Sequence, residues 1–131
     1  MSLVTRSADA SMDVSTGPFA PQITGLYAGE DLDPAAPCYI NSDGKVYMSN
    51  GTAANAAAAV DGFCPRSAKS GQPVTIFGEG TRFKYGSGLT PGATLYVGAT
   101  KGRLDTAATT GDSTGVVRCV NTTDIIVLRR K

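Results

Sequence analysis

Three carboxylates crowd into one short stretch of the chain, Glu30, Asp31 and Asp33 in the sequence Gly-Glu-Asp-Leu-Asp-Pro. Carboxylate oxygens this close together could bind Ca²⁺, and a carboxylate pair could act as acid and base in a hydrolysis. The spacing does not match an EF-hand loop, however, and Asp33-Pro34 is a common way to open a turn. We therefore interpret this cluster as a solvated turn.

A cysteine stands close to an arginine in Phe-Cys-Pro-Arg-Ser at residues 63–67, and a nearby cation could lower the pKa of the thiol. The chain has no histidine, which removes the usual base for a cysteine or serine nucleophile and the imidazole ligand of zinc or iron. The three cysteines, Cys38, Cys64 and Cys119, form no Cys-X-X-Cys pair. We interpret them as reduced, buried hydrophobes, with one disulfide and one free thiol as the alternative. No enzyme activity, cofactor or metal is expected.

Two glycine-rich stretches, residues 78–80 and 86–88, superficially resemble phosphate-binding loops. Neither contains a lysine and a serine or threonine in the order of a P-loop. We expect these glycines to supply bulges or positive φ angles at the ends of strands.

The 131 residues include 12 basic and 11 acidic side chains, a net charge of +1. Broad nucleic-acid binding needs a clear excess of cations, which this chain lacks. No apolar run approaches the roughly 18 residues of a membrane span, and residues 1–20 lack the apolar stretch of a signal peptide. These features predict one domain, made in a cytoplasm, with neither nucleic acid nor membrane as partner.

Turn residues are abundant, with 16 glycines and 7 prolines. Turn signals recur about every 8–12 residues, the spacing of a β-sandwich or small barrel. The sequence predicts an all-β fold of about eight or nine short strands. The clearest strands are expected at residues 24–28, 38–40, 46–48, 74–77, 82–85, 94–97, 116–120 and 125–128. The alanine-rich residues 52–60 are interpreted as a helical turn or a covering loop.

Two of these strands carry further information. Residues 82–85, Arg-Phe-Lys-Tyr, alternate so that both rings should lie on one face and both cations on the other. Residues 125–128 are four consecutive apolar side chains, which indicates a strand covered on both faces. The cations that follow, Arg129, Arg130 and Lys131, could blunt a sheet edge or could equally bind an acidic neighbouring surface.

An internal repeat relates residues 32–40 to residues 89–97, which share leucine, proline, alanine and tyrosine at matching positions. After one inserted residue Gly44 aligns with Gly102, and further along Cys64 lies near Cys119. We infer two similar β halves, residues 24–65 and 73–131, packed around a pseudo-two-fold axis. Chance similarity between turns rich in proline and glycine is the alternative.

Residues 1–22 differ from the rest because they are rich in small polar residues and show no periodicity. We interpret them as an extended arm beside a single β domain at residues 23–131, with a frayed terminus as the alternative. Pro18, Phe19 and Pro21 are its candidate anchors on a neighbouring subunit. Removal of residues 1–21 should then leave the β-core folded.

Residues 60–80, with Gly-Gln-Pro-Val-Thr at 71–75, and residues 89–127, with Leu-Thr-Pro-Gly-Ala-Thr-Leu-Tyr-Val at 89–97, resemble the cement or decoration proteins of tailed-phage capsids. The resemblance implies a structural virion protein that binds the outer surface of an expanded icosahedral head and staples neighbouring major-capsid subunits. Its partners would be the major capsid protein and copies of itself, with a trimer favoured and a dimer as the alternative. The candidate contacts are Pro18, Phe19, Pro21, Arg129, Arg130 and Lys131.

Two features depart from the family pattern: three cysteines stand where small apolar residues are expected, and the N-terminal arm bears prolines. Similar strings occur in the β-modules of phage tail fibres and baseplates. A module of that kind, binding a host glycan or an adaptor protein, is therefore the second hypothesis. Sugar binding usually uses exposed aromatic side chains, and this chain has no tryptophan. A small hydrolase is the third and weakest hypothesis.

Overall fold

The structure is a computed structural model that describes residues 3–12 and 22–128. It confirms the all-β class. The elements are β1 (Arg6–Met12), β2 (Gln22–Tyr27), β3 (Pro37–Ile40), β4 (Val46–Met48), the 3-10 helix η2 (Ala56–Ala58), β5 (Gly62–Phe63), β6 (Pro73–Phe77), β7 (Arg82–Gly86), β8 (Thr94–Val97), β9 (Leu104–Asp105), β10 (Val117–Cys119) and β11 (Asp124–Val127).

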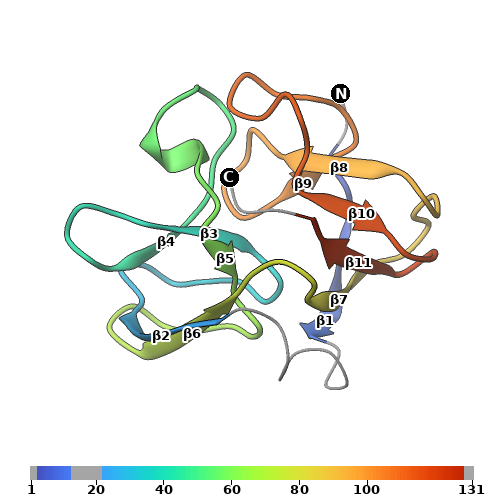
Figure 1. Ribbon diagram of the computed structural model, residues 1–131. Helices are drawn as coiled ribbons and strands as arrows, with labels where there is room; N and C mark the ends of the chain where they lie inside the picture. Colours follow the sequence, from blue (N-terminus) through green and yellow to red (C-terminus); the bar gives the residue numbers. More distant parts are fainter. Residues whose placement is uncertain (1–2, 13–21, 129–131) are drawn as a thin grey trace.

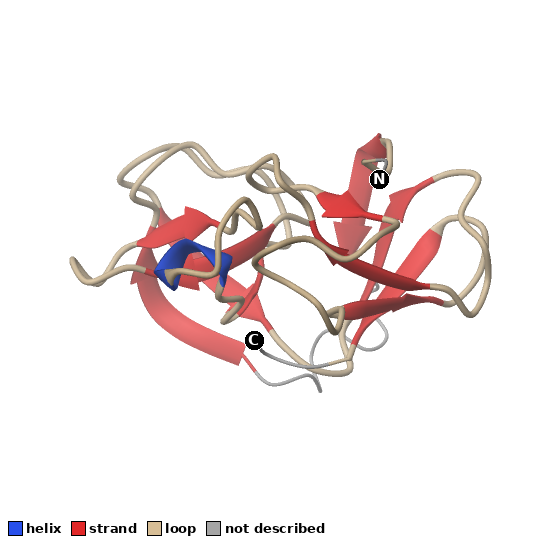
Figure 2. Cartoon of the chain, turned by 90° about the horizontal axis from the view of Figure 1, so that it is seen from above, coloured by secondary structure: helices blue, strands red, loops and turns tan. Residues whose placement is uncertain are grey.

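The strands form two antiparallel sheets that lie side by side (Figure 1). The five-stranded sheet has the order β2-β6-β5-β3-β4, and the six-stranded sheet has the order β1-β7-β11-β10-β8-β9. Seen from above, the two sheets form an elongated body with η2 at the end that carries the five-stranded sheet (Figure 2).

The two sheets repeat one design. We call residues 22–77 the first unit and residues 82–127 the second unit. If β2 to β6 are matched in order with β7 to β11, both units have the same strand order. The register matches as well. In the first unit Cys38 of β3 lies opposite Gly62 of β5, and at the equivalent positions of the second unit Leu95 of β8 lies opposite Val117 of β10. The two units therefore share both strand order and register.

The boundary between the units differs from the one expected at residues 66–72. β6 follows that stretch but completes the first sheet by pairing with both β2 and β5. The chain crosses to the second sheet only at residues 78–81, between β6 and β7.

The alternation of buried and half-buried side chains along the strands shows which face of each sheet lies on the hydrophobic core. In β7 Phe83 and Tyr85 are fully buried while Arg82 and Lys84 are only half-buried, as the sequence predicts. The larger hydrophobic cluster joins the second unit to Val4 and to residues of the first unit, including Phe63 and Phe77. We call it the shared core. A second cluster lies entirely within the first unit.

Three expectations need correction. The sequence suggests a strand covered on both faces at residues 125–128, but Ile126 is half-buried and Leu128 is 37% exposed, because only alternate side chains face the shared core. β11 is not the edge strand that one interpretation of the basic end assumes, because it lies between β7 and β10. Residues 3–12, expected in an arm outside the domain, include β1 of the six-stranded sheet.

Candidate interaction surface

The six predicted contact residues, Pro18, Phe19, Pro21, Arg129, Arg130 and Lys131, lie outside the described residues. The structure does place the chain on either side of them. The stretch with the prolines joins the end of β1 to the start of β2. The basic end follows Leu128, whose backbone N–H donates to the carbonyl of Val116 at 2.8 Å.

The N-terminal segment is bound tightly to the second unit. Val4 is buried in the shared core, and its N–H donates to the carbonyl of Leu104 at 2.9 Å. The guanidinium of Arg103 donates to the carbonyl of Val4 at 3.0 Å. β1 then runs antiparallel to β7, so closely that a side chain at Gly86 would overlap the carbonyl of Thr5. Residues 3–12 are therefore part of the folded body.

Arg6 joins three segments that are distant in the sequence. Its Nη2 lies 2.7 Å from Oδ2 of Asp33, in the first unit, and its Nη1 donates to the carbonyl of Gly102, in the second unit, at 2.7 Å. The Arg6 side chain is only 13% exposed, so this ion pair is partly desolvated. One side chain thus connects the N-terminal segment to both units.

Glu30 makes a second link between the units. Its Oε1 accepts from Nζ of Lys101 at 2.6 Å, and its Oε2 accepts from the N–H of Met48 at 2.9 Å. The hydrogen bond and charge of Glu30 raise the pKa of Lys101. Lys101 lies in the turn between β8 and β9, so this turn of the second unit is held against the first unit.

Asp31 points to yet another partner. Its Oδ1 accepts from the N–H of Ser70, and its Oδ2 lies 3.6 Å from Nζ of Lys69. The backbone hydrogen bond and the nearby cation lower the pKa of Asp31. The three carboxylates of residues 30–33 therefore serve three different partners. In the described part of the chain no group of three or more His, Cys, Asp or Glu residues could hold a metal ion.

Backbone contacts add to these links. Gly51, in the loop between β4 and β5, donates to the carbonyl of Gly98 at 2.7 Å and accepts from Gly111 at 2.9 Å. A side chain at Gly51 would overlap the carbonyl of Val97. Thr52 adds a hydrogen bond from its hydroxyl to the carbonyl of Ala99. The start of the loop that contains η2 is thus hydrogen-bonded to loops of the second unit.

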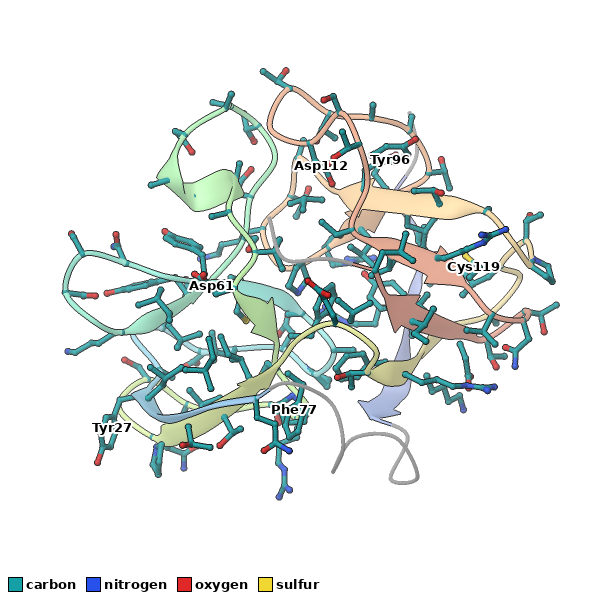
Figure 3. All side chains as sticks on the ribbon, in the orientation of Figure 1. Tyr27, Asp61, Phe77, Tyr96, Asp112 and Cys119 are labelled. Carbon is teal, nitrogen blue, oxygen red and sulfur yellow. The ribbon has the colours of Figure 1, made fainter. Side chains whose placement is uncertain are left out.

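Two aspartates occupy equivalent places in the units. Oδ2 of Asp61 accepts from the N–H of Ile40 at 2.8 Å, and Oδ2 of Asp112 accepts from the N–H of Val97 at 2.9 Å. Ile40 and Val97 are the last residues of β3 and β8. Asp61 and Asp112 lie in the loops that lead to β5 and β10 (Figure 3). Asp112 is fully buried and also accepts from Gly115 at 2.8 Å. Each carboxylate thus accepts from the backbone N–H at the end of a strand, and the one at Asp112 satisfies a buried donor.

The thiols are not activated. Cys38, Cys64 and Cys119 are free and buried, and burial raises the pKa of each of them. The thiol of Cys64 donates to the carbonyl of Arg66 at 2.7 Å. The arginine next to Cys64 therefore offers a backbone acceptor, and its charge is outweighed by desolvation. This geometry does not produce the thiolate that a nucleophile requires.

The surface has two larger hollows. One, of about 510 Å³, lies beside β2 and β6 and includes Arg66 and Phe77 in its lining. The other, of about 360 Å³, lies between the N-terminal segment and β8, and Leu89 and Cys119 line it. Both are open to solvent. Hydroxyls, backbone groups and apolar side chains line them, the first hollow adds the amides of Gln22 and Gln72, and Arg66 is the charged side chain among the described lining residues.

Sequence reasoning missed the residues that join the units. Glu30 and Lys101 are 71 positions apart, and Arg6 and Asp33 are 27 apart. No local pattern reveals such pairs. Asp112 did carry a signal, because aspartate followed by Ser-Thr-Gly is typical of a turn whose side chain accepts from the next backbone N–H groups.

No helix in the described residues is long and apolar enough to cross a membrane. No protein family, no curated protein and no solved structure matches this chain. Its function must therefore be inferred from the residues and geometry described above.

Proposed function

We propose that this protein is a structural component of a phage virion that binds the outside of the icosahedral head and staples neighbouring major-capsid subunits. The observation that carries the proposal is the resemblance of residues 60–80 and 89–127 to cement proteins. The motif residues 71–75 lead into β6, and residues 89–97 form the turn before β8 and the strand itself.

The mechanical organisation of the chain supports this role. The two units share one hydrophobic core and are linked by the Arg6–Asp33 and Lys101–Glu30 pairs. A staple must transmit force between the two subunits that it contacts, so its own halves must not separate. A ligand that binds only the assembled, expanded shell stabilises that shell by mass action. Repetition over symmetry-related sites multiplies a modest contact.

We assign the contacts with the head to two segments that lie outside the described residues. These are the segment with Pro18, Phe19 and Pro21, and the basic end with Arg129, Arg130 and Lys131. The first would add extended, apolar contacts, and the second would add charge attraction to an acidic surface of the major capsid protein. Copies of this chain would occupy symmetry-related positions on the shell, as a trimer or a dimer.

The test is to mix the purified protein with expanded, undecorated heads and to image them by electron cryomicroscopy. The proposal predicts extra density at local three-fold or two-fold positions between capsid subunits. Two variants, Phe19→Ala and a chain truncated after Leu128, should bind heads more weakly. Both should unfold at the same temperature as the unaltered protein. Binding only to tails or to host cells would overturn the proposal and favour the tail-fibre or baseplate module.

A further inference from the structure

The two units differ at one edge. In the second unit β1 pairs with the outer edge of β7, whereas β2, the equivalent strand of the first unit, ends its sheet. Within residues 3–12 and 22–128, no segment pairs with the outer edge of β2 from Ile23 to Tyr27. An uncovered edge presents backbone donors and acceptors to another strand.

This edge lacks the usual protection by charge. β2 reads Gln-Ile-Thr-Gly-Leu-Tyr and contains no charged residue or proline. Tyr27 is 55% exposed and lies at the outer end of the strand, at the periphery of the molecule (Figure 3). The equivalent strand β7 carries Arg82 and Lys84, yet it is the covered one. Among the described strands, the less charged edge is therefore the one that has no partner.

A bulge arranges the side chains of β2 symmetrically. Ile23 lies opposite Ile76 and Leu26 lies opposite Val74, so β2 has one extra residue between these pairs, where Gly25 has a φ of 77°. The extra residue lets Ile23 and Leu26, three positions apart, both pack against the first-unit cluster. The strand thus has an apolar residue at equal distance on either side of the Thr24–Gly25 bond.

We infer that the outer edge of β2 pairs with β2 of a second copy, antiparallel across a two-fold axis. A two-fold axis perpendicular to a sheet makes paired strands antiparallel, which is also how β1 covers β7. If the axis passes between Thr24 and Gly25, Ile23 of each copy lies opposite Leu26 of the other. The two first-unit clusters then become neighbours across the axis, and the two β2 strands bring no like charges together.

The alternative occupant, β1 of a second copy, fits less well. β1 follows Val4, which is buried in the shared core, and Arg6, which is paired with Asp33. Transfer of β1 to another molecule would expose or unpair both groups. Self-pairing through β2 leaves these contacts intact. A contact through one short strand is small, so the dimer should be weak and should form at micromolar to millimolar concentration.

The test is the mass of the full chain in solution, by sedimentation over that concentration range, without any heads. We expect reversible conversion from a single chain to two chains. Thr24 is exposed, and Thr24→Lys should weaken dimerisation at least about tenfold by placing two cations beside the axis. Thr110→Lys, the same change at an exposed loop position of the second unit, should leave dimerisation unchanged.

Charge complementation then identifies the partner. Thr24→Glu alone should also be monomeric, and an equimolar mixture of Thr24→Lys and Thr24→Glu should dimerise again. A chain that stays monomeric, a trimer, or a dimer that is insensitive to both Thr24 variants would overturn the inference. The proposed head binding is measured separately on heads, so either idea can fail while the other stands.

Discussion

The first and second units share strand order and register, but they differ in how far the rest of the chain encloses them. β1 covers the outer strand of the second unit. The tip of the β8–β9 turn, also in the second unit, packs against Met48 of the first unit. In the first unit no described segment pairs with the outer edge of β2, and a methyl group added to Gly44 at the tip of the β3–β4 turn would meet no described atom within 4 Å. The same strand arrangement is thus enclosed by other described segments in the second unit and more accessible in the first.

The difference appears even at equivalent turn positions. Ala35 precedes β3 with a φ of 57°, and Gly92 precedes β8 with a φ of 83°. The N–H of Ala35 donates to the carbonyl of Cys64, just as that of Gly92 donates to Cys119. The backbone geometry is therefore kept where the residue type is not. Ala35 tolerates this conformation while it is fully buried in the shared core.

Removal of the enclosing segment should have the largest effect. Without residues 1–12 the chain loses β1, the buried Val4 and the Arg6–Asp33 pair, so we expect a loss of about 5 kcal/mol in the free energy of unfolding. Denaturant unfolding would measure this loss, and Val4→Ala alone should cost about 1–3 kcal/mol. An unchanged midpoint of denaturant unfolding would mean that residues 1–12 do not stabilise the fold, which is what the sequence alone suggests.

The next largest effect should come from the ring contact between the units. Phe83 is fully buried, and its ring lies 5.6 Å from that of Phe63. Phe83→Ala should cost about 3–5 kcal/mol and should lower the stability of both units together. Hydrogen exchange resolved by residue would show whether β3 and β8 lose protection to the same extent. If only β8 loses protection, the two units are not coupled as we describe.

The turn tips offer a matched pair of substitutions with a smaller effect. Gly44 and Gly102 have φ angles of 79° and 75°, so an alanine at either position costs about 1–2 kcal/mol in backbone strain. A methyl group at Gly102 would also overlap the sulfur of Met48. Gly102→Ala should therefore be more destabilising than Gly44→Ala by about 1–3 kcal/mol. Equal losses, measured by thermal unfolding, would contradict the packing of this turn on the first unit.

Alkaline pH should lower the free energy of unfolding gradually. Burial raises the pKa of Cys38 and Cys64 in the first unit and of Cys119 and Tyr85 in the second. Each group ionises first in the unfolded chain. Its contribution to stability is therefore complete below the pKa that its thiol or phenol has in the unfolded chain, and it is lost as pH rises through the raised pKa of the folded protein. Cys38 should contribute a slope of up to about 1.4 kcal/mol per pH unit above roughly pH 9.

Cys38→Ala is the variant that checks this slope. Its free energy of unfolding should be lower at neutral pH because a buried group is lost, but it should fall less steeply between pH values of about 9 and 10. Identical slopes for the two proteins would mean that Cys38 is not buried as a neutral thiol.

Much of the fold could be predicted from the sequence because its signals are local. The alternation in residues 82–85 and the turn residues around β3, β4 and β8 each depend on a few neighbouring side chains. The repeat was visible for the same reason, since residues 32–40 and 89–97 keep similar residues at the same turns. β1 was not predicted, because its small polar residues have no alternation and it is held by pairing with β7.

The candidate site was predicted less well, for a physical reason. Contacts such as Arg6 with Asp33 join residues that only the folded topology brings together. The sequence predicts a solvated turn for the carboxylates at residues 30–33, yet Glu30 and Asp33 both bind cations of other segments. The predicted contacts at Phe19 and at the basic end remain predictions, since they lie outside the described residues.

The most direct test of the stapling role is the heat stability of expanded heads with and without saturating protein. We predict that the temperature of head disruption rises on saturation, and that the rise is smaller with Phe19→Ala at equal concentration. A ligand that prefers the intact shell must stabilise it. Heads that bind the protein at every site but break at the unchanged temperature would contradict the account, because the protein would then decorate the shell without stapling it.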